Sequence, residues 1–418
     1  YIGSTYQCPA LAAWPNSKFM NSYILIAILA GIVWTVRTLS GVRAFAPYFK
    51  YLPEPLWCYF LPTLLSTVGW IPQDAPIYGV MSKKLLPACL ILMLVGTDLK
   101  AIIRLSPRAL LAMFWGSVGI GIGGLVTYML LFKTAIFPGA DAIPRPWEAW
   151  GCLSATWTGG SANMVAVREI LQTPEQVFSV LVIMDTIVAY SWMALLVYAS
   201  KYQSGLDHWL KADNSEFPES HPVITETAAH SVSHNNASGL AYKTGLAILA
   251  YGAGELCARA AGFLPAVGSV LNTFTWTVIC ATVLPLALSV TPARKMDDYG
   301  AGKAGSFMLY FLLTTIGARA NFSALISAPW LVLGGLVWVL IHGLVLITAG
   351  KMFRIPSALL AAASQANVGG TISAPLVASV YNQKYASLGL LLAVLGNIYG
   401  TYAGLLASEV CRWFGNLI

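Results

Sequence analysis

Long runs of apolar residues, separated by short polar stretches, make up most of the chain after residue 20. About 20 mostly apolar residues of α-helix are needed to cross about 30 Å of hydrocarbon, and twelve segments approach that length. They are 21–38, 55–72, 85–98, 109–132, 149–171, 176–199, 244–262, 266–291, 304–319, 328–350, 356–380 and 385–408. The pattern predicts an all-α polytopic membrane protein with about 10–12 transmembrane segments.

Polar stretches divide the chain into four parts. Residues 1–20 form an N-terminal extramembrane segment, and residues 21–200 form a first transmembrane repeat. A polar linker follows at 201–243, and a second transmembrane repeat at 244–410.

The two halves resemble copies of one another. Residues 27–30 and 247–250 both read Ala-Ile-Leu-Ala, an offset of 220. Further pairs follow in the same order: Cys58 with Cys280 and Pro107 with Pro329 at 222, the glycine pairs at 159–160 and 369–370 at 210, and Asp185 with Asn397 at 212. Apolar segments also align by chance, but five ordered features at nearly one offset favour a duplication.

Basic residues favour opposite sides in the two halves, which predicts inverted repeats. After odd-numbered segments of the first half stand Arg37, Arg43, Lys50, Lys100, Arg104, Arg108 and Arg168; after even-numbered segments of the second half stand Arg294, Lys295, Lys303, Lys351, Arg354 and Arg412. Inversion requires an odd number of crossings per repeat. One segment in each half is therefore expected not to cross fully, and the proline-bearing 55–72 and 266–291 are the best candidates.

Composition supports the membrane assignment and excludes other classes. Hydrophobic residues make up 57%, charged residues only 10%, and the mean hydropathy is +0.69. A soluble domain is about a quarter charged, so a soluble enzyme and a disordered chain are excluded. The net charge of +7 comes from isolated Lys and Arg between apolar runs, and nucleic acid is not expected as a partner. The seven scattered cysteines give neither a disulfide framework nor a metal motif.

Two matching segments interrupt the apolar pattern with glycine pairs flanked by small polar residues. Such interruptions break helices, and broken backbone at membrane depth is tolerated only inside protein or along a watery cavity. Matched breaks in both halves indicate a transporter's binding site. Close packing of helices through small residues is the alternative, but it leaves the polar residues unexplained. The candidate site residues here are Thr158, Gly159, Gly160, Ser161, Asn163, Gln365, Asn367, Gly369, Gly370, Thr371 and Ser373.

Asp185 lies in the middle of an apolar segment, with no basic residue within a dozen positions. A carboxylate at the bilayer centre costs at least about 2.5–3.5 kcal/mol, so such a residue is a functional candidate. It would hold a proton or ligate Na⁺; the alternative is a protonated Asp that only joins two helices. Asn397 is its counterpart and the remaining candidate ligand. Glu255, the other acid inside a span, has Arg259 one turn away and is expected to form an ion pair.

The run Gly159–Val167, followed by Met184-Asp185-Thr186, resembles the YjcL-like family of bacteria and plastids, domain of unknown function 819. The resemblance also covers Leu64–Ser66 and Asp98–Ile102 and extends over roughly 20–415. It implies a place among cation/proton antiporters and bile-acid-type sodium symporters, with two crossed broken helices, a core domain and a separate scaffold. In such relatives the acid after the first broken helix carries the ion, and Asp185 matches it. Many proton antiporters have two adjacent acids, which this chain lacks.

These observations predict a secondary active transporter of an unidentified small solute, an organic anion, coupled to Na⁺ or H⁺ with elevator-like alternating access. A Na⁺/H⁺ antiporter and a transport-inactive subunit of a larger membrane complex are alternatives, and a membrane enzyme is not expected. No cofactor is expected beyond Na⁺ as coupling ion, and partners are the bilayer, the solute and either a second copy or a larger complex. Tyr1 in place of Met fits a processed protein of a plastid-type organellar membrane, and a bacterial inner membrane fits nearly as well.

Overall fold

A computed structural model shows how the chain is arranged. The structure describes residues 21–45, 48–49, 54–133, 145–213, 237–266, 272–319, 329–382 and 385–417. All regular secondary structure in these ranges is helical, as the sequence predicts. The predicted N-terminal segment 1–20 and residues 214–236 of the predicted linker lie outside the described residues.

The helices of the two halves follow each other in a similar order. The first half contains α1 (Ser22–Ser40), α3 (Glu54–Thr67), α4 (Pro76–Val95), α5 (Leu99–Ile103), α6 (Pro107–Phe132), α7 (Pro146–Gly159), α8 (Ser161–Leu171), α9 (Glu175–Ala199), η3 (Ser200–Tyr202) and α10 (Gln203–Leu210). The second half contains α11 (Ala237–Ala261), α12 (Thr273–Ser289), η4 (Pro292–Asp297), α13 (Ala301–Arg319), α15 (Pro329–Phe353), α16 (Ser357–Val368), α17 (Gly370–Tyr381) and α18 (Ala386–Leu417).

Six stretches of described helix are long and apolar enough to cross a bilayer: Ser22–Ser40, Pro76–Val95, Pro107–Phe132, Val177–Leu210, Trp330–Phe353 and Ala386–Leu417. The apolar helices Thr273–Ser289 and Gly370–Tyr381 are shorter than a full span. The chain is therefore a multi-pass integral membrane protein.

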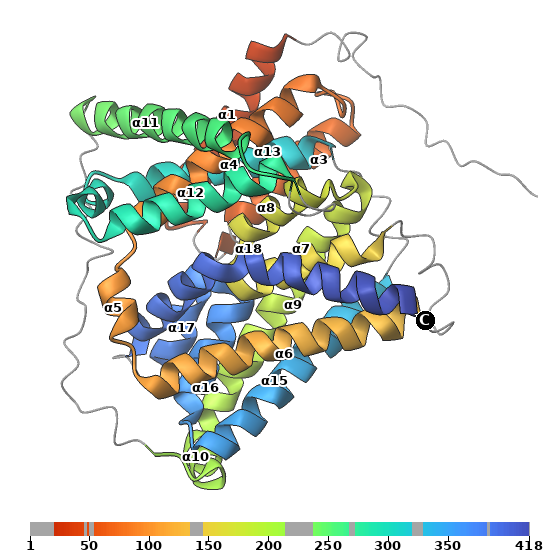
Figure 1. Cartoon of the computed structure of the whole chain (residues 1–418), viewed down its shortest axis with the longest axis vertical. Coiled ribbons are helices and arrows are strands. Elements are labelled where there is room, and N and C mark those ends of the chain that lie inside the picture. Colours follow the sequence, from red (N-terminus) through yellow and green to blue (C-terminus); the bar gives the residue numbers. More distant parts are fainter. Residues whose placement is uncertain are drawn as a thin grey trace, which may run out of the picture.

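The helices form two bodies, which we call the scaffold and the core domain (Figure 1). The scaffold consists of α1, α3, α4, α11, α12, η4 and α13, and α4 packs against α11, α12 and α13 within it. The core domain consists of α6 to α9 and α15 to α18; its closest pairs are α7 with α18 and α6 with α15. In Figure 1 the scaffold occupies the upper part of the view, and α6, α15, α16 and α17 lie below it.

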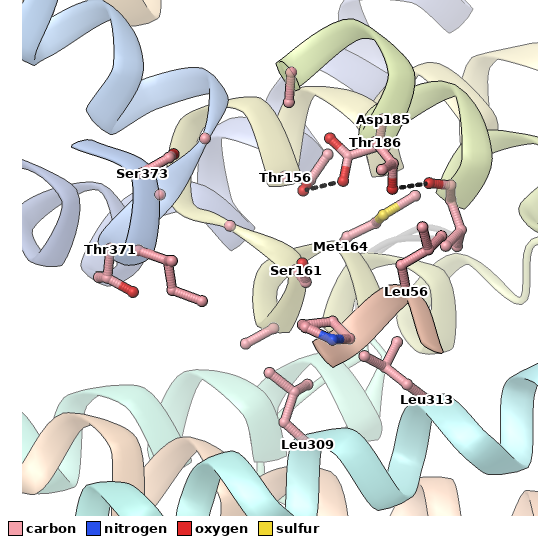
Figure 2. A pocket seen from close by; sticks show the side chains of 18 of the residues that line it. Leu56, Thr156, Ser161, Met164, Asp185, Thr186, Leu309, Leu313, Thr371 and Ser373 are labelled. Atoms are coloured by element: carbon pink, nitrogen blue, oxygen red, sulfur yellow. Dashed lines mark hydrogen bonds between the residues drawn. The ribbon is translucent and has the colours of Figure 1, made fainter. Parts of the chain in front are cut away.

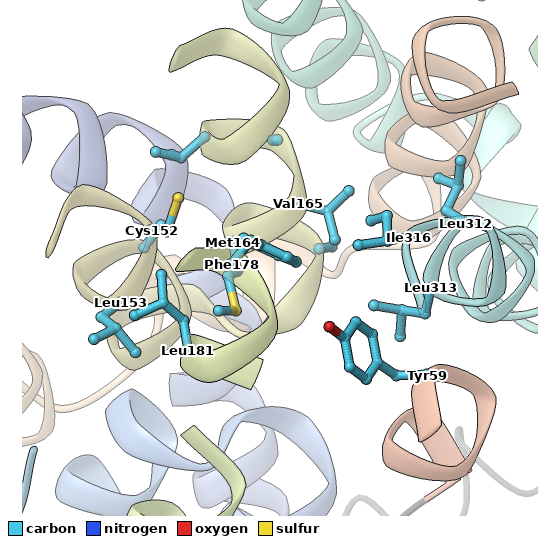
Figure 3. Packing of buried hydrophobic residues seen from close by; sticks show 14 of the residues in the cluster. Tyr59, Cys152, Leu153, Met164, Val165, Phe178, Leu181, Leu312, Leu313 and Ile316 are labelled. Carbon is cyan, nitrogen blue, oxygen red and sulfur yellow. The ribbon is translucent and has the colours of Figure 1, made fainter. Parts of the chain in front are cut away.

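Apolar side chains join the two bodies. Figure 3 shows Val165 of α8 opposite Ile316 of α13 and Tyr59 of α3, and all three are buried in one hydrophobic cluster. The helix pairs in contact across this boundary include α8 with α4 and α12, and α9 with α3 and α13. Burial of apolar side chains is non-directional, so this apolar part of the contact holds the bodies together without fixing their relative position.

The first glycine-pair segment is a helical hairpin made of α7 and α8, which we call hairpin 1. The Sγ atom of Cys152, in the middle of α7, lies 3.5 Å from Oγ1 of Thr173, which follows α8. Two half-helices in line would separate these residues by about 30 Å, at 1.5 Å per residue. The chain instead reverses at Gly160, whose φ of 81° lies in the left-handed region that glycine adopts without steric cost.

The second glycine-pair segment, α16 and α17, is also a hairpin, which we call hairpin 2. Its two outer ends lie beside the same corner of the core domain. The backbone N–H of Ser357 donates to Asp207 of α10 at 2.7 Å, and the Tyr381 hydroxyl donates to the carbonyl of Leu196 in the last turn of α9 at 2.8 Å. The turn contains Gly370, with φ 69°.

The hairpins enter the core domain from opposite ends, and α18 shows this directly. Gly151 near the base of hairpin 1 packs against Gly404 and Ser408 in the C-terminal half of α18. Ala374 in hairpin 2 packs against Gly389 near the start of α18. We name the two ends of the molecule after one residue at each. The helices α1 and α9 end at the Arg37 end, and α8 and α13 end at the Arg319 end.

This arrangement corrects the prediction of two crossed broken helices. The breaks are present where predicted, but each segment returns to the end from which it entered. The segments 149–171 and 356–380 are therefore not full crossings. The proline-bearing segments, predicted to be incomplete, form α3 with 14 residues and α12 with 17, both shorter than a full span. α3 nevertheless extends from the Arg37 end, where Glu54 bonds Ser40, toward the Arg319 end, where Thr63 donates to the carbonyl of Gly317.

Candidate functional site

A cavity with a volume of about 280 Å³ lies between the core domain and the scaffold, where the tips of the two hairpins meet (Figure 2). A Cβ atom at Gly370 would lie 3.9 Å from the Cα atom of Gly160, so the tips are in contact distance. Nine of the thirteen candidate residues from the sequence line this cavity: Gly160, Ser161, Asp185, Gln365, Gly369, Gly370, Thr371, Ser373 and Asn397.

The two walls of the cavity differ in chemistry. The core wall carries most of the hydroxyl groups and all of the amide and carboxylate groups, and Figure 2 shows Ser161, Thr371 and Asp185 on three different helices of this wall. The scaffold wall contains mainly apolar side chains: Pro55 and Leu56 of α3, Met93 of α4, and Ser306, Leu309, Tyr310 and Leu313 of α13. A ligand in the cavity would therefore make its polar contacts with the core domain and rest against the scaffold.

Asp185 is the acid of this cavity, and its two oxygens have different partners. Oδ1 accepts a hydrogen bond of 2.7 Å from the Trp157 indole N–H. Oδ2 has only a long contact of 3.4 Å with the Thr156 hydroxyl. Within the described ranges, no Lys or Arg forms an ion pair with Asp185. The carboxylate is thus oriented by neutral donors, and Oδ2 remains available to a proton or a cation.

The hairpin tips also place the N-terminal ends of two helices at the cavity. α8 begins at Ser161 and α17 begins at Gly370, and both residues line the cavity. The first N–H groups of a helix have no partner within it, and the helix dipole makes this end favourable for negative charge. Ser161, Thr371 and Ser373 add hydroxyl groups at the same place.

Two amides complete the core wall. Gln365 donates from Nε2 to the Ser373 hydroxyl at 2.8 Å, a bond across the turn of hairpin 2. Gln365 is 1% exposed, and its Oε1 has no partner among the described residues. Asn397, the counterpart of Asp185, comes from α18, and its Oδ1 would lie 3.3 Å from a Cβ atom at Gly160. The residues on either side of the tips are therefore held within reach of one cavity.

Four of the predicted site residues do not line the cavity and instead hold the hairpins in place. Asn163 donates to the carbonyl of Gly159 at 2.5 Å and accepts from the Thr401 backbone N–H at 3.0 Å, which ties hairpin 1 to α18. Asn367 is fully buried and accepts from Ser117 of α6 at 3.1 Å.

Close helix packing explains the other two, Thr158 and Gly159. A Cβ atom at Gly396 would lie 2.2 Å from the Thr158 carbonyl oxygen, and one at Gly400 would lie 2.7 Å from the Cα atom of Gly159. With Gly404, these glycines repeat every four residues along one face of α18, which allows close approach of backbones. The packing explanation is thus right for Gly159, whereas Gly160 makes the turn.

A larger cavity of about 1140 Å³ continues from the site toward the Arg37 end. The two cavities share eight lining residues: Met93, Tyr190, Ser306, Tyr310, Thr371, Ile372, Ser373 and Asn397. The larger one is also lined by charged groups, namely Arg37, Glu54, Asp297, Asp298 and Lys303. At the opposite end, Arg319 of the scaffold pairs with Glu175 of the core domain at 3.4 Å.

Sequence reasoning missed several residues of the site. Thr156 and Trp157 contact Asp185, and Trp157 is fully buried. Both lie one turn before the glycine pair, so their position beside the break was the available signal.

His342 supports hairpin 2 from behind. Its Nδ1 lies 2.8 Å from the Gly116 carbonyl, and its Nε2 lies 2.9 Å from the Ser364 hydroxyl, which also accepts from Trp192 at 2.8 Å. The carbonyl can only accept, so Nδ1 carries the proton and the neutral ring satisfies the whole set. His342 therefore links α6, α15 and α16.

Comparisons with known proteins show the family of the chain. The chain is 23% identical over 370 residues to a Bacillus subtilis protein described as "Uncharacterized membrane protein YjcL", covering 85% of this chain and 88% of that protein. The family model described as "Protein of unknown function (DUF819)" matches residues 23–414, nearly the whole chain. The chain belongs to this family of membrane proteins.

Proposed function

We propose that this protein is a secondary active transporter of a small organic anion, coupled to Na⁺ or H⁺, in which the core domain moves against the scaffold. The observation that carries the proposal is the cavity at the meeting point of two hairpins that enter from opposite ends. Interrupted helices at matching places in two halves are a feature of transporter binding sites. The cavity between the hairpin tips has a volume of about 280 Å³, which suits a small solute rather than a drug-sized one.

The ends of α8 and α17 support an anionic solute. Two helix N-termini direct partial positive charge and free N–H groups toward one place, where Ser161 and Thr371 can donate further hydrogen bonds. Charge-assisted hydrogen bonds of this kind are about twice as strong as neutral ones. A carboxylate or phosphate group of the solute would occupy this position.

Asp185 supports coupling to a cation. In the described ranges no cluster of three His, Cys, Asp or Glu side chains could hold a metal ion, so a coupling ion would rely on one carboxylate and neutral oxygens. Na⁺ prefers such hard oxygen ligands, and Gln365, Ser373 and Asn397 lie on the same cavity. A proton on Oδ2 would serve equally. An anion and a cation bound together would neutralise each other inside the membrane.

The difference between the walls supports movement of the core domain. Polar ligands on one body let the site travel with its cargo, and the mainly apolar opposite wall offers few competing bonds. The site continues into the large cavity at the Arg37 end, whereas the Arg319–Glu175 pair joins the bodies at the other end. Most basic residues of the described ranges also lie at the Arg37 end, which favours a cytoplasmic location for it.

An inverted relation between residues 21–199 and 244–408 remains part of this proposal. The hairpins of the two halves enter from opposite ends, and the packing is reciprocal: α3 packs on α13, and its counterpart α12 packs on α4. If α3 and α12 cross despite their short helices, each half has five crossing segments once the hairpins are removed from the count, which is the odd number that inversion requires.

Na⁺/H⁺ antiport is the second candidate, because Asp185 alone could exchange the two ions. The discriminating experiment is a thermal-stability screen of the purified protein with Na⁺ and a panel of small carboxylates and phosphate esters. A ligand that binds the folded state raises the melting temperature by mass action. We expect an organic anion to stabilise the protein more in Na⁺ or at low pH than in K⁺ at high pH.

Uptake of that anion into proteoliposomes under an imposed Na⁺ or pH gradient then tests transport itself. Stabilisation by Na⁺ with no response to any organic anion would favour the antiporter. Neither stabilisation nor uptake of any tested ion or solute would contradict both candidates and favour an inactive subunit.

A further inference from the structure

A third cavity, of about 270 Å³, lies within the scaffold and away from the hairpins. It is formed by α4, α11 and α12. Its polar lining comes from Lys83, Lys84, Glu255, Thr273 and Thr277, and its apolar lining includes Phe274. None of these residues belongs to the candidate site.

The polar lining lies where the charge-free stretches of all three helices end. On α4 no charged residue occurs from Leu85 to Thr97, directly after the two lysines. On α11 the charge-free stretch runs from Thr244 to Gly254, directly before Glu255. α12 starts at Thr273 and carries no charge. This boundary is the depth at which phospholipid headgroups meet the hydrocarbon.

The charge of the cavity is positive. Lys84 bonds Glu255 at 2.5 Å, which neutralises one charge of each sign. Arg259, the partner that the sequence predicted for Glu255, follows it by one turn of α11, but the ion pair in the described residues is the one with Lys84. Lys83 forms no ion pair with any residue in the described ranges and stands beside Lys84. An anion entering here would meet more positive than negative groups, together with threonine hydroxyls.

We propose that this cavity binds the phosphate of an anionic phospholipid, with Lys83 and Lys84 on the headgroup and the acyl chains along the apolar side near Phe274. Basic pockets between transmembrane helices are suited to such headgroups. The lipid would bind to the scaffold, the body that stays in place while the core domain moves. The proposal is independent of the transported solute.

The test measures melting temperature and native mass spectra of the purified protein with phosphatidylglycerol, phosphatidylcholine or soluble glycerol phosphate. Phosphatidylglycerol should stabilise the wild type and remain bound, and the other two should not. Lys83→Gln leaves the Lys84–Glu255 pair intact and should weaken phosphatidylglycerol binding about fivefold. The further change Lys84→Gln should weaken it again by a similar factor.

The variant Glu255→Gln tests most directly whether phosphate binds Lys84, because it removes the charge that pairs with this lysine. If phosphate competes with Glu255 for Lys84, this variant should bind phosphatidylglycerol more tightly, whereas a purely structural ion pair predicts only lower stability. Lys100→Gln with Arg104→Gln, at the Arg37 end, is the matched control and should leave binding unchanged. Equal stabilisation by glycerol phosphate would overturn the lipid assignment. Unchanged phosphatidylglycerol binding in Lys83→Gln would overturn the site.

Discussion

The two walls of the hairpin cavity are built by different kinds of sequence. The core wall consists of interrupted helices, with glycine turns at Gly160 and Gly370 and polar side chains beside them. The scaffold wall consists of uninterrupted helices whose side chains here are mostly apolar, such as Leu309 and Leu313. In the proposed transport function, one body would recognise the ligands and the other would provide a surface along which it moves.

The largest expected effect is that of removing the carboxylate from the core wall. Asp185→Asn keeps the size and removes the charge, so ion-coupled uptake in proteoliposomes should fall to background, while folding and membrane insertion are retained. The matched control is Asp98→Asn, which changes an acid that pairs with Arg294 within the scaffold. Coupling of wild-type strength in Asp185→Asn would mean that the carboxylate is structural.

A methyl group at a hairpin tip should be costly for stability. Gly160 has φ 81°, and an L-residue in this conformation costs on the order of 1–3 kcal/mol. Gly160→Ala should therefore lower the melting temperature and reduce uptake. Gly121→Ala is the control, because a Cβ atom there meets nothing within 4 Å and Ala favours the helix by roughly 0.5–1 kcal/mol. Similar melting temperatures for both variants would argue against a strained turn.

The same chemical change on the two walls compares them directly. Ser161→Ala removes a hydroxyl from the core wall, where a hydrogen bond to a charged ligand contributes about 1.5–3 kcal/mol. Solute affinity should fall about tenfold or more. Ser306→Ala on the scaffold wall removes a hydroxyl that donates to Gly302 in its own helix at 2.9 Å, and affinity should change by less than about twofold. Equal losses would mean that both walls bind the solute.

The smallest effect is expected from the ion pair between the bodies. Arg319→Gln removes a partly exposed contact with Glu175, which is still paired with Arg168, so the conformational equilibrium should shift by about 1 kcal/mol at most. A cysteine at the buried Ser179 should then react up to about fivefold faster with a soluble maleimide. Arg294→Gln, within the scaffold, is the control and should leave this rate unchanged.

Hydrophobic patterning predicted the helices closely because each crossing requires a long apolar run. The segment predicted at 176–199 is α9 from Glu175 to Ala199, for example. The start of α4 was placed too late, at residue 85, because the helix extends past Lys83 and Lys84 to Pro76. Charged residues mark the end of the hydrocarbon, but a helix can continue beyond it.

The hairpin reversal could not be predicted in the same way. A glycine pair shows that the helix breaks, but the angle between its halves depends on contacts such as Cys152 with Thr173 and Gly151 with Gly404. The direction of each polar side chain near the break also depends on these tertiary contacts. The sequence pattern therefore could not distinguish side chains that face the cavity, such as Ser161, from those that face α18, such as Asn163.

The central claim is that the core domain moves as a unit past the scaffold, and distances between spin labels test it without knowledge of the solute. Labels are placed on exposed positions in a chain whose native cysteines are replaced by alanine. Three pairs of labels are compared. The first pair, Ile248 and Leu376, has one label on each body; the second, Ile248 and Trp34, lies within the scaffold; and the third, Leu376 and Leu406, lies within the core domain. Double electron–electron resonance in lipid should give two distance populations for the first pair and one for each of the others. A single population for the first pair in every ion and pH condition, or two populations within the core domain, would contradict movement of the core domain as a rigid body.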